Sequence, residues 1–220
     1  LRFYSRTPEL FYPTLFQTSC SGEFLDEWNK NAPALSSAIS EEAIFSSHNV
    51  HFIPPYLREK AGIIERAGQE TFADIIQPQD IRGIIHSHSY WRDGSQTIEQ
   101  MAKACIEQGY EDLVISDHSK SAFYANGLSE QRIREQQAQI DELNARLAPF
   151  RIFKSIECDI LYDGLLDYPN ETLATFDLVI ASIHSNIKMT EEKAMTRLLN
   201  AIQNPYTTIL GHMTGRLLLS

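Results

Sequence analysis

The sequence lacks the features of several protein classes. Its 220 residues include 19 Lys and Arg against 29 Asp and Glu, so the formal net charge is −10. A chain this acidic does not bind nucleic acid through a broad basic surface, although it can cleave nucleic acid if bound cations meet the phosphate. No run approaches the roughly 20 apolar residues of a membrane span, and no signal peptide is visible. We therefore expect a cytoplasmic protein with no membrane partner.

Cysteine is also scarce. The three cysteines, Cys20, Cys105 and Cys158, are odd in number and far apart. They indicate reduced thiols and exclude a disulfide framework or a CxxC zinc motif. The chain has no initiator Met, which indicates a fragment of a longer protein. Its apolar content of 43% predicts a globular chain, and its length of 220 residues predicts one or two domains.

A regular pattern begins near residue 80. Five apolar runs, each typical of a buried parallel strand, alternate with stretches of helical periodicity. The runs are IRGIIHSHS, DLVISDHS, RIFKSIECD, DLVIASIHS and TTILGHMTG. Ser129 and Thr190 are N-cap residue types and predict two of the helix starts. For the helix after Thr190 we expect a buried stripe formed by Ala194, Met195, Leu198, Leu199 and Ile202.

Each apolar run ends in imidazole or carboxylate side chains. Parallel α/β barrels gather the carboxyl ends of their strands at one face, so these residues are expected to converge there. They are His86, His88, Asp117, His118, Glu157, His184 and His212. Outside this pattern, His48 and His51 are interpreted as structural or surface residues.

A metal site explains these residues better than separate structural roles do. His86 and His88 are two residues apart on one strand, so both imidazoles can face one ion. Glu157 is a charge inside an apolar strand, as expected for a carboxylate that bridges two ions. Asp117 is either a helix cap or a residue that orients His118.

The ligand types indicate the metal. Mixed imidazole and carboxylate ligands suit Zn or Mn, with Fe as a further option, and the lack of thiolates argues against a structural zinc site. The number of ligands exceeds what one ion can use, so we expect a cluster of two or three ions. Such clusters clamp phosphate oxygens.

These motifs resemble those of a known family. The HxH followed by DG, with ISDHSKS, SIECDIL, ASIHS and GHMTGR, resembles the PHP (polymerase and histidinol phosphatase) domain, especially that of bacterial family-X DNA polymerases. The resemblance covers residues 81–220. Upstream, FIPPYLRE resembles the segment that joins the polymerase thumb to the PHP domain, so residues 1–75 resemble the end of a thumb, with a linker to residue 80.

The resemblance implies a fold and a site. The fold would be a distorted (β/α)7 barrel of the α/β class, truncated here after about five βα units, with a small α+β N-terminal segment. The site would hold up to three ions. The first would take His86, His88 and Glu157, the second Glu157, His184 and His212, and the third Asp93 and His118. Arg216 and Lys120 would contact phosphate, and Asp117 and Glu157 would also serve catalysis.

The implied activity is metal-dependent phosphoester hydrolysis on DNA. A 3′ end or single strand would be the substrate, in 3′–5′ exonuclease or 3′-end repair reactions. A polymerase domain would lie in the same chain. No Asp-x-Asp pair occurs here, so the polymerase palm is missing and this piece should not polymerise DNA alone.

Three other interpretations remain open. The domain could be a catalytically silent scaffold for the polymerase, a histidinol-phosphatase-like phosphatase of small molecules, or an amidohydrolase. Amidohydrolase barrels also begin with HxH but usually add a bridging Lys, and no strand here ends in one.

Overall fold

The chain forms two compact units. The computed structural model describes residues 4, 6–31, 37–69, 72, 75–121 and 127–213. The units are Leu1–Gln77 and Pro78–Ser220. Arg216 falls outside the described residues. None of the helices in the described ranges is long and apolar enough to cross a bilayer.

The first unit is helical. Its elements are α1 (Pro8–Thr18), α2 (Gly22–Asn31), α3 (Glu41–Ser46), the 3-10 helix η1 (Pro55–Leu57) and α4 (Ile63–Gln69). Phe24 and Trp28, one helical turn apart on α2, both pack against Phe16 of α1. The expected α+β segment thus differs from the structure, in which the described part of this unit contains helices and no strand. The aromatic residues of α2 recur at the spacing of one helical turn, which favours a helix over a strand.

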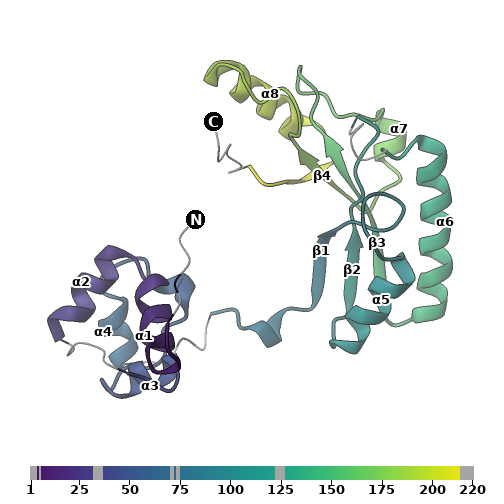
Figure 1. Ribbon diagram of the computed structural model, residues 1–220. Helices are drawn as coiled ribbons and strands as arrows, with labels where there is room; N and C mark the ends of the chain where they lie inside the picture. The colour runs from purple at the N-terminus through teal and green to yellow at the C-terminus, as the bar shows by residue number, and fades with distance from the viewer. Residues whose placement is uncertain are drawn as a thin grey trace. The chain divides into compact units, whose positions relative to one another are not determined.

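The second unit is built on a parallel sheet. Its strands are β1 (Gly83–Ser87), β2 (Asp112–Ile115), β3 (Arg151–Asp159), β4 (Leu178–Ser182) and β5 (Thr207–Leu210), preceded by the 3-10 helix η2 (Pro78–Asp80). They lie in sequence order, and every neighbouring pair is parallel. Among the described strands, β1 and β5 each have one partner, so the sheet is an open, curled part of a barrel (Figure 1). The predicted α/β class and strand order are confirmed.

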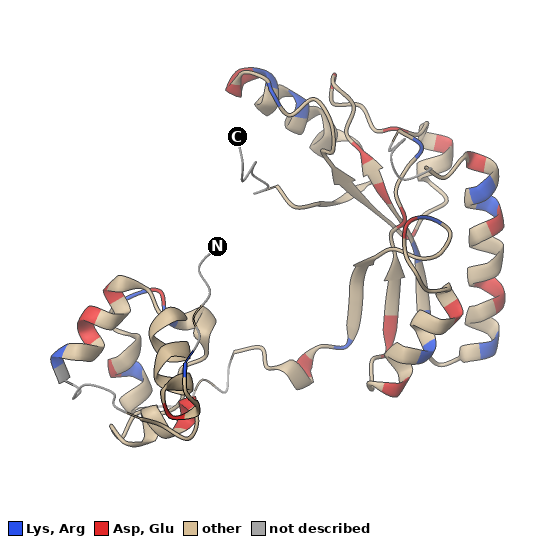
Figure 2. Cartoon of the chain, in the orientation of Figure 1, with Lys and Arg blue, Asp and Glu red and all other residues tan. Residues whose placement is uncertain are grey.

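Helices connect the strands and cover the sheet. They are α5 (Ile98–Glu107), α6 (Glu130–Leu147), α7 (Asn170–Leu173) and α8 (Glu191–Gln203). The side chains of Ser129 and Thr190 cap α6 and α8, which confirms the two predicted helix starts. Figure 1 shows α5 and α6 near β1–β3, and a Glu99–Arg146 ion pair of 3.0 Å joins these two helices. Charges of both signs alternate along α6 (Figure 2), so this helix presents no basic stripe.

The helix α8 departs from its predicted packing. Its expected buried stripe includes Met195, Leu199 and Ile202, but these side chains are 48–52% exposed. The buried positions are Ala201 and the guanidinium-bearing Arg197. Periodicity identifies an apolar face, but it does not show whether another element covers that face. Here the helix turns Arg197 inward, toward backbone carbonyls. The predicted stripe is therefore only partly buried: Leu198 packs against the core, whereas Met195, Leu199 and Ile202 do not.

Candidate metal centre

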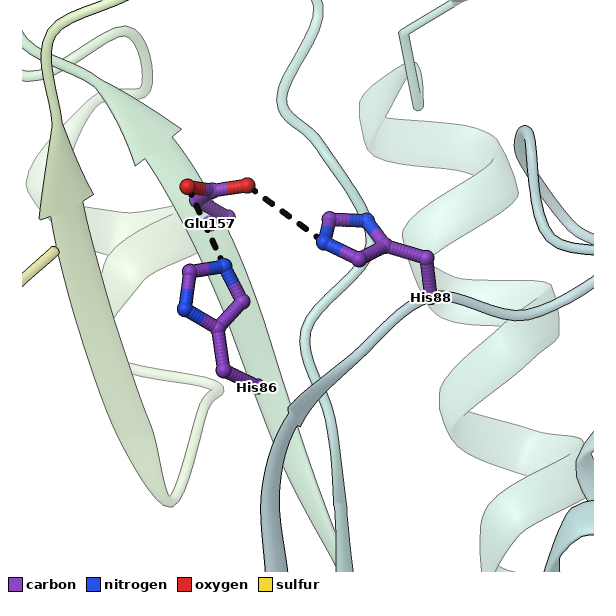
Figure 3. Close-up of side chains that lie close together, drawn as sticks. All are labelled: His86, His88 and Glu157. Atoms are coloured by element: carbon purple, nitrogen blue, oxygen red, sulfur yellow. Dashed lines mark ion pairs between the residues drawn. The ribbon is translucent and has the colours of Figure 1, made fainter. Parts of the chain in front are cut away.

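The predicted histidines converge on one carboxylate. Glu157 lies on β3, and its side chain is 1% exposed. Its Oε1 has three imidazole nitrogens nearby, the Nε2 atoms of His86 at 3.1 Å, His184 at 3.2 Å and His212 at 2.7 Å. Its Oε2 lies 3.0 Å from His118 Nδ1 and 3.6 Å from His88 Nε2. Figure 3 shows His86 and His88 pointing at the two different oxygens.

Parallel strand pairing produces this convergence. The amide of Glu157 donates to the carbonyl of Asp117, and the amide of Ser119 donates to the carbonyl of Glu157, both at 3.0 Å. This pairing places His118 beside Glu157 on the neighbouring segment. The strands β1, β4 and β5 then deliver their histidines to the same end of the sheet, as the βα architecture predicts.

The two histidines of β1 reach the site through an irregular backbone. We expected regular alternation to place His86 and His88 on one strand face. Instead the register shifts between Ile84 and Ser87, and His86 has a φ of 67°. His88 lies beyond the end of β1. His212 has a φ of 31°. Non-glycine residues adopt positive φ at an energetic cost, and such conformations concentrate at functional sites.

The carboxylate of Asp159 orients His184. Asp159 is two residues beyond Glu157 on β3 and 5% exposed. Its Oδ1 forms a short hydrogen bond with His184 Nδ1, which leaves Nε2 directed at Glu157. A carboxylate on the second nitrogen of an imidazole is the usual way in which proteins orient a metal-binding histidine.

Asp117 is bound to the loop after His88 and to α6. The side chain is fully buried, and its carboxylate accepts three hydrogen bonds of 2.6 Å from Ser89 N, Ser89 Oγ and Gln136 Nε2. Asp117 therefore fixes Ser89, the residue after His88. It holds the loop that carries His88 against α6.

The remaining predicted residues lie at the edge of the cluster or outside it. Asp93 is 45% exposed at its side chain, 3.7 Å from His88 Nδ1 and 3.9 Å from His118 Nε2. The ammonium group of Lys120 pairs with Glu130 at 2.8 Å and lies over the ring of Tyr168. His48 bonds to the carbonyl of Ile44 in the first unit, consistent with the structural role expected for it.

The pKa values of the clustered side chains are shifted by burial and by their close neighbours. Burial acts to raise the pKa of Glu157, but hydrogen bonds, led by that from His184, outweigh it and hold the pKa well below the usual range. The hydrogen bond to Asp159 and then that to Glu157 raise the pKa of His184 to about 9. Burial lowers the pKa of His118 to about 4. Burial also raises the pKa of Asp117 despite its hydrogen bonds.

The donor set fits divalent cations. Three groups of side chains bring their ligand atoms within 4.8 Å of one another, namely His86–His88–Glu157, His88–Asp93–His118 and His118–Glu157–His184. A carboxylate oxygen has about two lone-pair sites, yet three imidazoles approach Oε1 of Glu157. Hydrogen bonding alone does not require so many nitrogens, whereas shared cations do. The cluster is compatible with a metal site of imidazole and carboxylate ligands.

Sequence reasoning missed one residue that shapes the surroundings of this cluster. The guanidinium of Arg197 on α8 donates to the carbonyls of Leu161 at 2.8 Å and Ser185 at 3.1 Å, and also to that of Ile160. It thus ties the loop after β3 to the loop that follows His184. Arg197 is a charged residue within the apolar half of an amphipathic helix, and this position in the sequence could have indicated its buried role.

Known proteins resemble this chain. A DNA polymerase/3′-5′ exonuclease PolX of Bacillus subtilis is 42% identical over 182 residues, which cover 81% of this chain and 31% of that protein. The resemblance to a family-X DNA polymerase is confirmed. A probable phosphatase of Acetivibrio thermocellus is 32% identical over 135 residues, 59% of this chain and 50% of that protein. No protein-family model matches the chain.

A third relative extends the phosphatase group. A probable phosphatase of Caldicellulosiruptor bescii is 25% identical over 139 residues, again 59% of this chain and 50% of that protein. The chain therefore spans about a third of the PolX relative and half of each phosphatase relative. Polymerase/exonuclease and phosphatase relatives together agree with the PHP-type motifs of the sequence.

Proposed function

We propose that Pro78–Ser220 forms a metal-dependent phosphoesterase domain in which Glu157 is the central metal ligand. The observation that supports this most is the approach of five imidazoles to the two oxygens of one buried carboxylate. Hydrolysis of phosphoesters is also the chemistry common to an exonuclease and a phosphatase, the two kinds of name that the relatives carry.

The proposed ligands form overlapping groups around Glu157. Two groups share this carboxylate, namely His86–His88–Glu157 and His118–Glu157–His184, and His88–Asp93–His118 offers a further position. His212 approaches Oε1 of Glu157 at 2.7 Å and would add a ligand there. Up to three Zn or Mn ions would be held, with Fe as an alternative. When bound, they would polarise the phosphoryl oxygens and lower the pKa of a bound water.

The other residues of the site position these ligands and the substrate. Asp159 fixes the ring of His184, and Asp117 fixes the loop that carries His88. Lys120 would contact a non-bridging phosphate oxygen after exchanging its present partner, Glu130. Arg216 would provide a second phosphate contact. Because the formal net charge of the chain is −10, these two cations would act locally on one phosphate rather than along a strand.

We further propose that the substrate is the 3′ end of single-stranded DNA, in 3′–5′ exonuclease or end-processing reactions. The name and the 42% identity of the PolX relative support this choice. The helical unit Leu1–Gln77 would be the end of a polymerase thumb, and the whole protein would also be a DNA-directed DNA polymerase. A small-molecule phosphatase is the second candidate, supported by relatives named probable phosphatases.

One assay separates these candidates. Purified chain, loaded with Mn or Zn, is incubated with a single-stranded oligonucleotide and with p-nitrophenyl phosphate. Release of mononucleotides from the 3′ end, faster than hydrolysis of the small ester, supports the exonuclease. The opposite preference supports the phosphatase. Activity that survives a chelator would exclude the metal-dependent class, and an inactive protein that holds its metal would favour a silent scaffold.

A matched pair of variants tests the role of the cluster in the same assay. Glu157→Gln removes the shared carboxylate charge and should abolish both activities. His51→Ala removes an exposed imidazole of the first unit that is absent from the cluster, and activity should stay at the wild-type level. Equal activity in the two variants would contradict the proposed role of Glu157.

A further inference from the structure

The loop between two proposed ligands also carries two aromatic side chains. His88 and Asp93 belong to one donor group, and Tyr90 and Trp91 lie between them in the sequence. Two residues of chain span at most about 7 Å, so the backbone of Tyr90 lies within that distance of the backbone of His88. The backbone of this segment therefore begins beside a proposed ligand.

Hydrogen bonds hold the loop in one conformation. Ser89 is fully buried and bound to Asp117 through both its amide and its hydroxyl. The amide of Tyr90 donates to the carbonyl of Gln96 at 2.7 Å, and the amides of Arg92 and Gly94 both donate to the carbonyl of Ser89. A side chain at Gly94 would meet the carbonyl oxygen of His88 at 2.2 Å, so the loop closes tightly. A rigid loop presents its side chains at little entropic cost.

The exposed side of the loop faces a hollow. The hollow has a volume of about 280 Å³ and is lined by Tyr90, Trp91, Thr97, Ile98, Arg132 and Gln139. The indole of Trp91 is fixed there, because its Nε1 donates to Gln139 at 2.6 Å and the guanidinium of Arg132 lies over its ring. Tyr90, by contrast, is 71% exposed. One wall of the hollow is thus an exposed aromatic ring on a rigid loop.

We infer that this hollow binds the terminal base of a single-stranded DNA substrate, which stacks on Tyr90 while the adjacent phosphate lies at the cluster. The inference rests on the proposed function and names a part of its substrate. Aromatic side chains are common platforms for the bases of single strands, because every base offers a π face. Stacking also suits a chain of net charge −10, which has few cations with which to attract a polyanion.

The test compares substrates that differ by one base. Two oligonucleotides share all phosphates and sugars, but one has an abasic 3′-terminal residue. For the wild type, kcat/KM should be about tenfold higher with the base present, the range expected for one stacking contact. Tyr90→Ala should bring the base-containing substrate down to the abasic rate and leave the abasic rate unchanged. Tyr90→Phe, which keeps the ring, should behave like the wild type.

Ile81→Ala is the matched control. Ile81 is a large apolar side chain that is 44% exposed, but it precedes β1 and so lies at the opposite end of that strand. Its removal should change neither rate. Equal loss on both substrates in Tyr90→Ala, or no loss on either, would overturn the base site while leaving the phosphoesterase proposal intact.

A second measurement does not depend on turnover. An oligonucleotide with a 3′-terminal 5-iodouracil and a terminal phosphorothioate linkage is irradiated with the Mn-loaded protein. Peptide mass spectrometry should locate the crosslink at Tyr90 or Trp91, and Tyr90→Ala should reduce the yield. A crosslink confined to residues outside the hollow would contradict the inference, even if the oligonucleotide proves not to be cleaved.

Discussion

The ends of β2 and β3 carry two buried carboxylates in contrasting surroundings. Asp117 at the end of β2 is surrounded by an amide, a hydroxyl and a side-chain amide, each of which donates one hydrogen bond at 2.6 Å. Glu157 on β3 is surrounded by five imidazoles. The pKa of Asp117 is raised by burial, whereas that of Glu157 is lowered despite burial.

In our proposal this contrast distinguishes a structural acid from a metal ligand. The partners of Asp117 are hydrogen-bond donors that satisfy a carboxylate fully, so nothing further is needed to explain its burial. The partners of Glu157 are themselves ligands, and they exceed what hydrogen bonding to one carboxylate requires. Burial or charge alone therefore does not identify a metal ligand, whereas the chemistry of the neighbouring groups does.

The largest effect is expected for Glu157→Gln. The amide keeps the shape of the side chain but cannot offset the charge of two nearby cations. We expect phosphoester hydrolysis to fall by more than about 100-fold, because even outer partners of metal ligands contribute 10- to 100-fold. Initial rates with Mn or Zn measure this. Asp117→Asn, assayed in parallel, should retain most of the activity. A larger loss of activity in Asp117→Asn than in Glu157→Gln would contradict the difference proposed between the two carboxylates.

Asp159→Asn should have the next largest effect. It removes the charge that holds Nδ1 of His184, but it removes no contact to Glu157 itself. We expect metal affinity to weaken by about 10- to 100-fold, measured by competition with a chromophoric chelator. Asp163, an exposed carboxylate beyond the end of β3, provides the control Asp163→Asn. Unchanged affinity in Asp159→Asn would show that packing alone orients His184.

For Asp117→Asn the effect should be on stability. The amide nitrogen would face a group that donates to Asp117 in the wild type, which leaves at least one buried donor without an acceptor. We expect the free energy of unfolding to fall by about 1–3 kcal/mol, measured by chemical denaturation. Added metal should raise the Tm of this variant as much as it raises that of the wild type, whereas the rise in Glu157→Gln should be smaller. Loss of that rise in Asp117→Asn would contradict the structural role.

The smallest effect is expected for an exposed carboxylate. Glu130 pairs with Lys120 at 2.8 Å, and both side chains are at least 40% exposed. Exposed ion pairs contribute about 0–1 kcal/mol, so Glu130→Gln should change the free energy of unfolding by less than about 1 kcal/mol. Because Lys120 is released, hydrolysis should be unchanged or faster. A loss of stability in Glu130→Gln larger than that in Asp117→Asn would contradict the expected difference between an exposed and a buried carboxylate.

Much of this arrangement follows from the sequence. Continuous apolar runs that alternate with capped helices predict the parallel sheet, and a donor at the end of each run predicts the convergence of His86, Glu157 and His184. These inferences depend on local pattern and on the chirality and parallel order of βα units. The local pattern and the order of the βα units can both be recognised in short segments of sequence.

The rest depends on contacts between distant segments. The sequence does not show that Ser89 and Gln136 would satisfy Asp117, since they lie 28 and 19 residues away. The register shift between Ile84 and Ser87 is likewise a feature of the pairing of β1 with β2, which the residues of β1 alone do not show. The burial of α8 was predicted only in part for the same reason, because an amphipathic pattern does not identify which element packs against each residue of the helix.

The most direct test of the central claim is the metal content of three proteins after dialysis against Zn or Mn. The wild type and Asp117→Asn should hold the same number of ions per chain, and Glu157→Gln should hold at least one fewer, as determined by elemental analysis. Circular dichroism should show that all three are folded. Equal metal content in the wild type and Glu157→Gln, or a loss confined to Asp117→Asn, would contradict the assignment of Glu157 as the shared ligand.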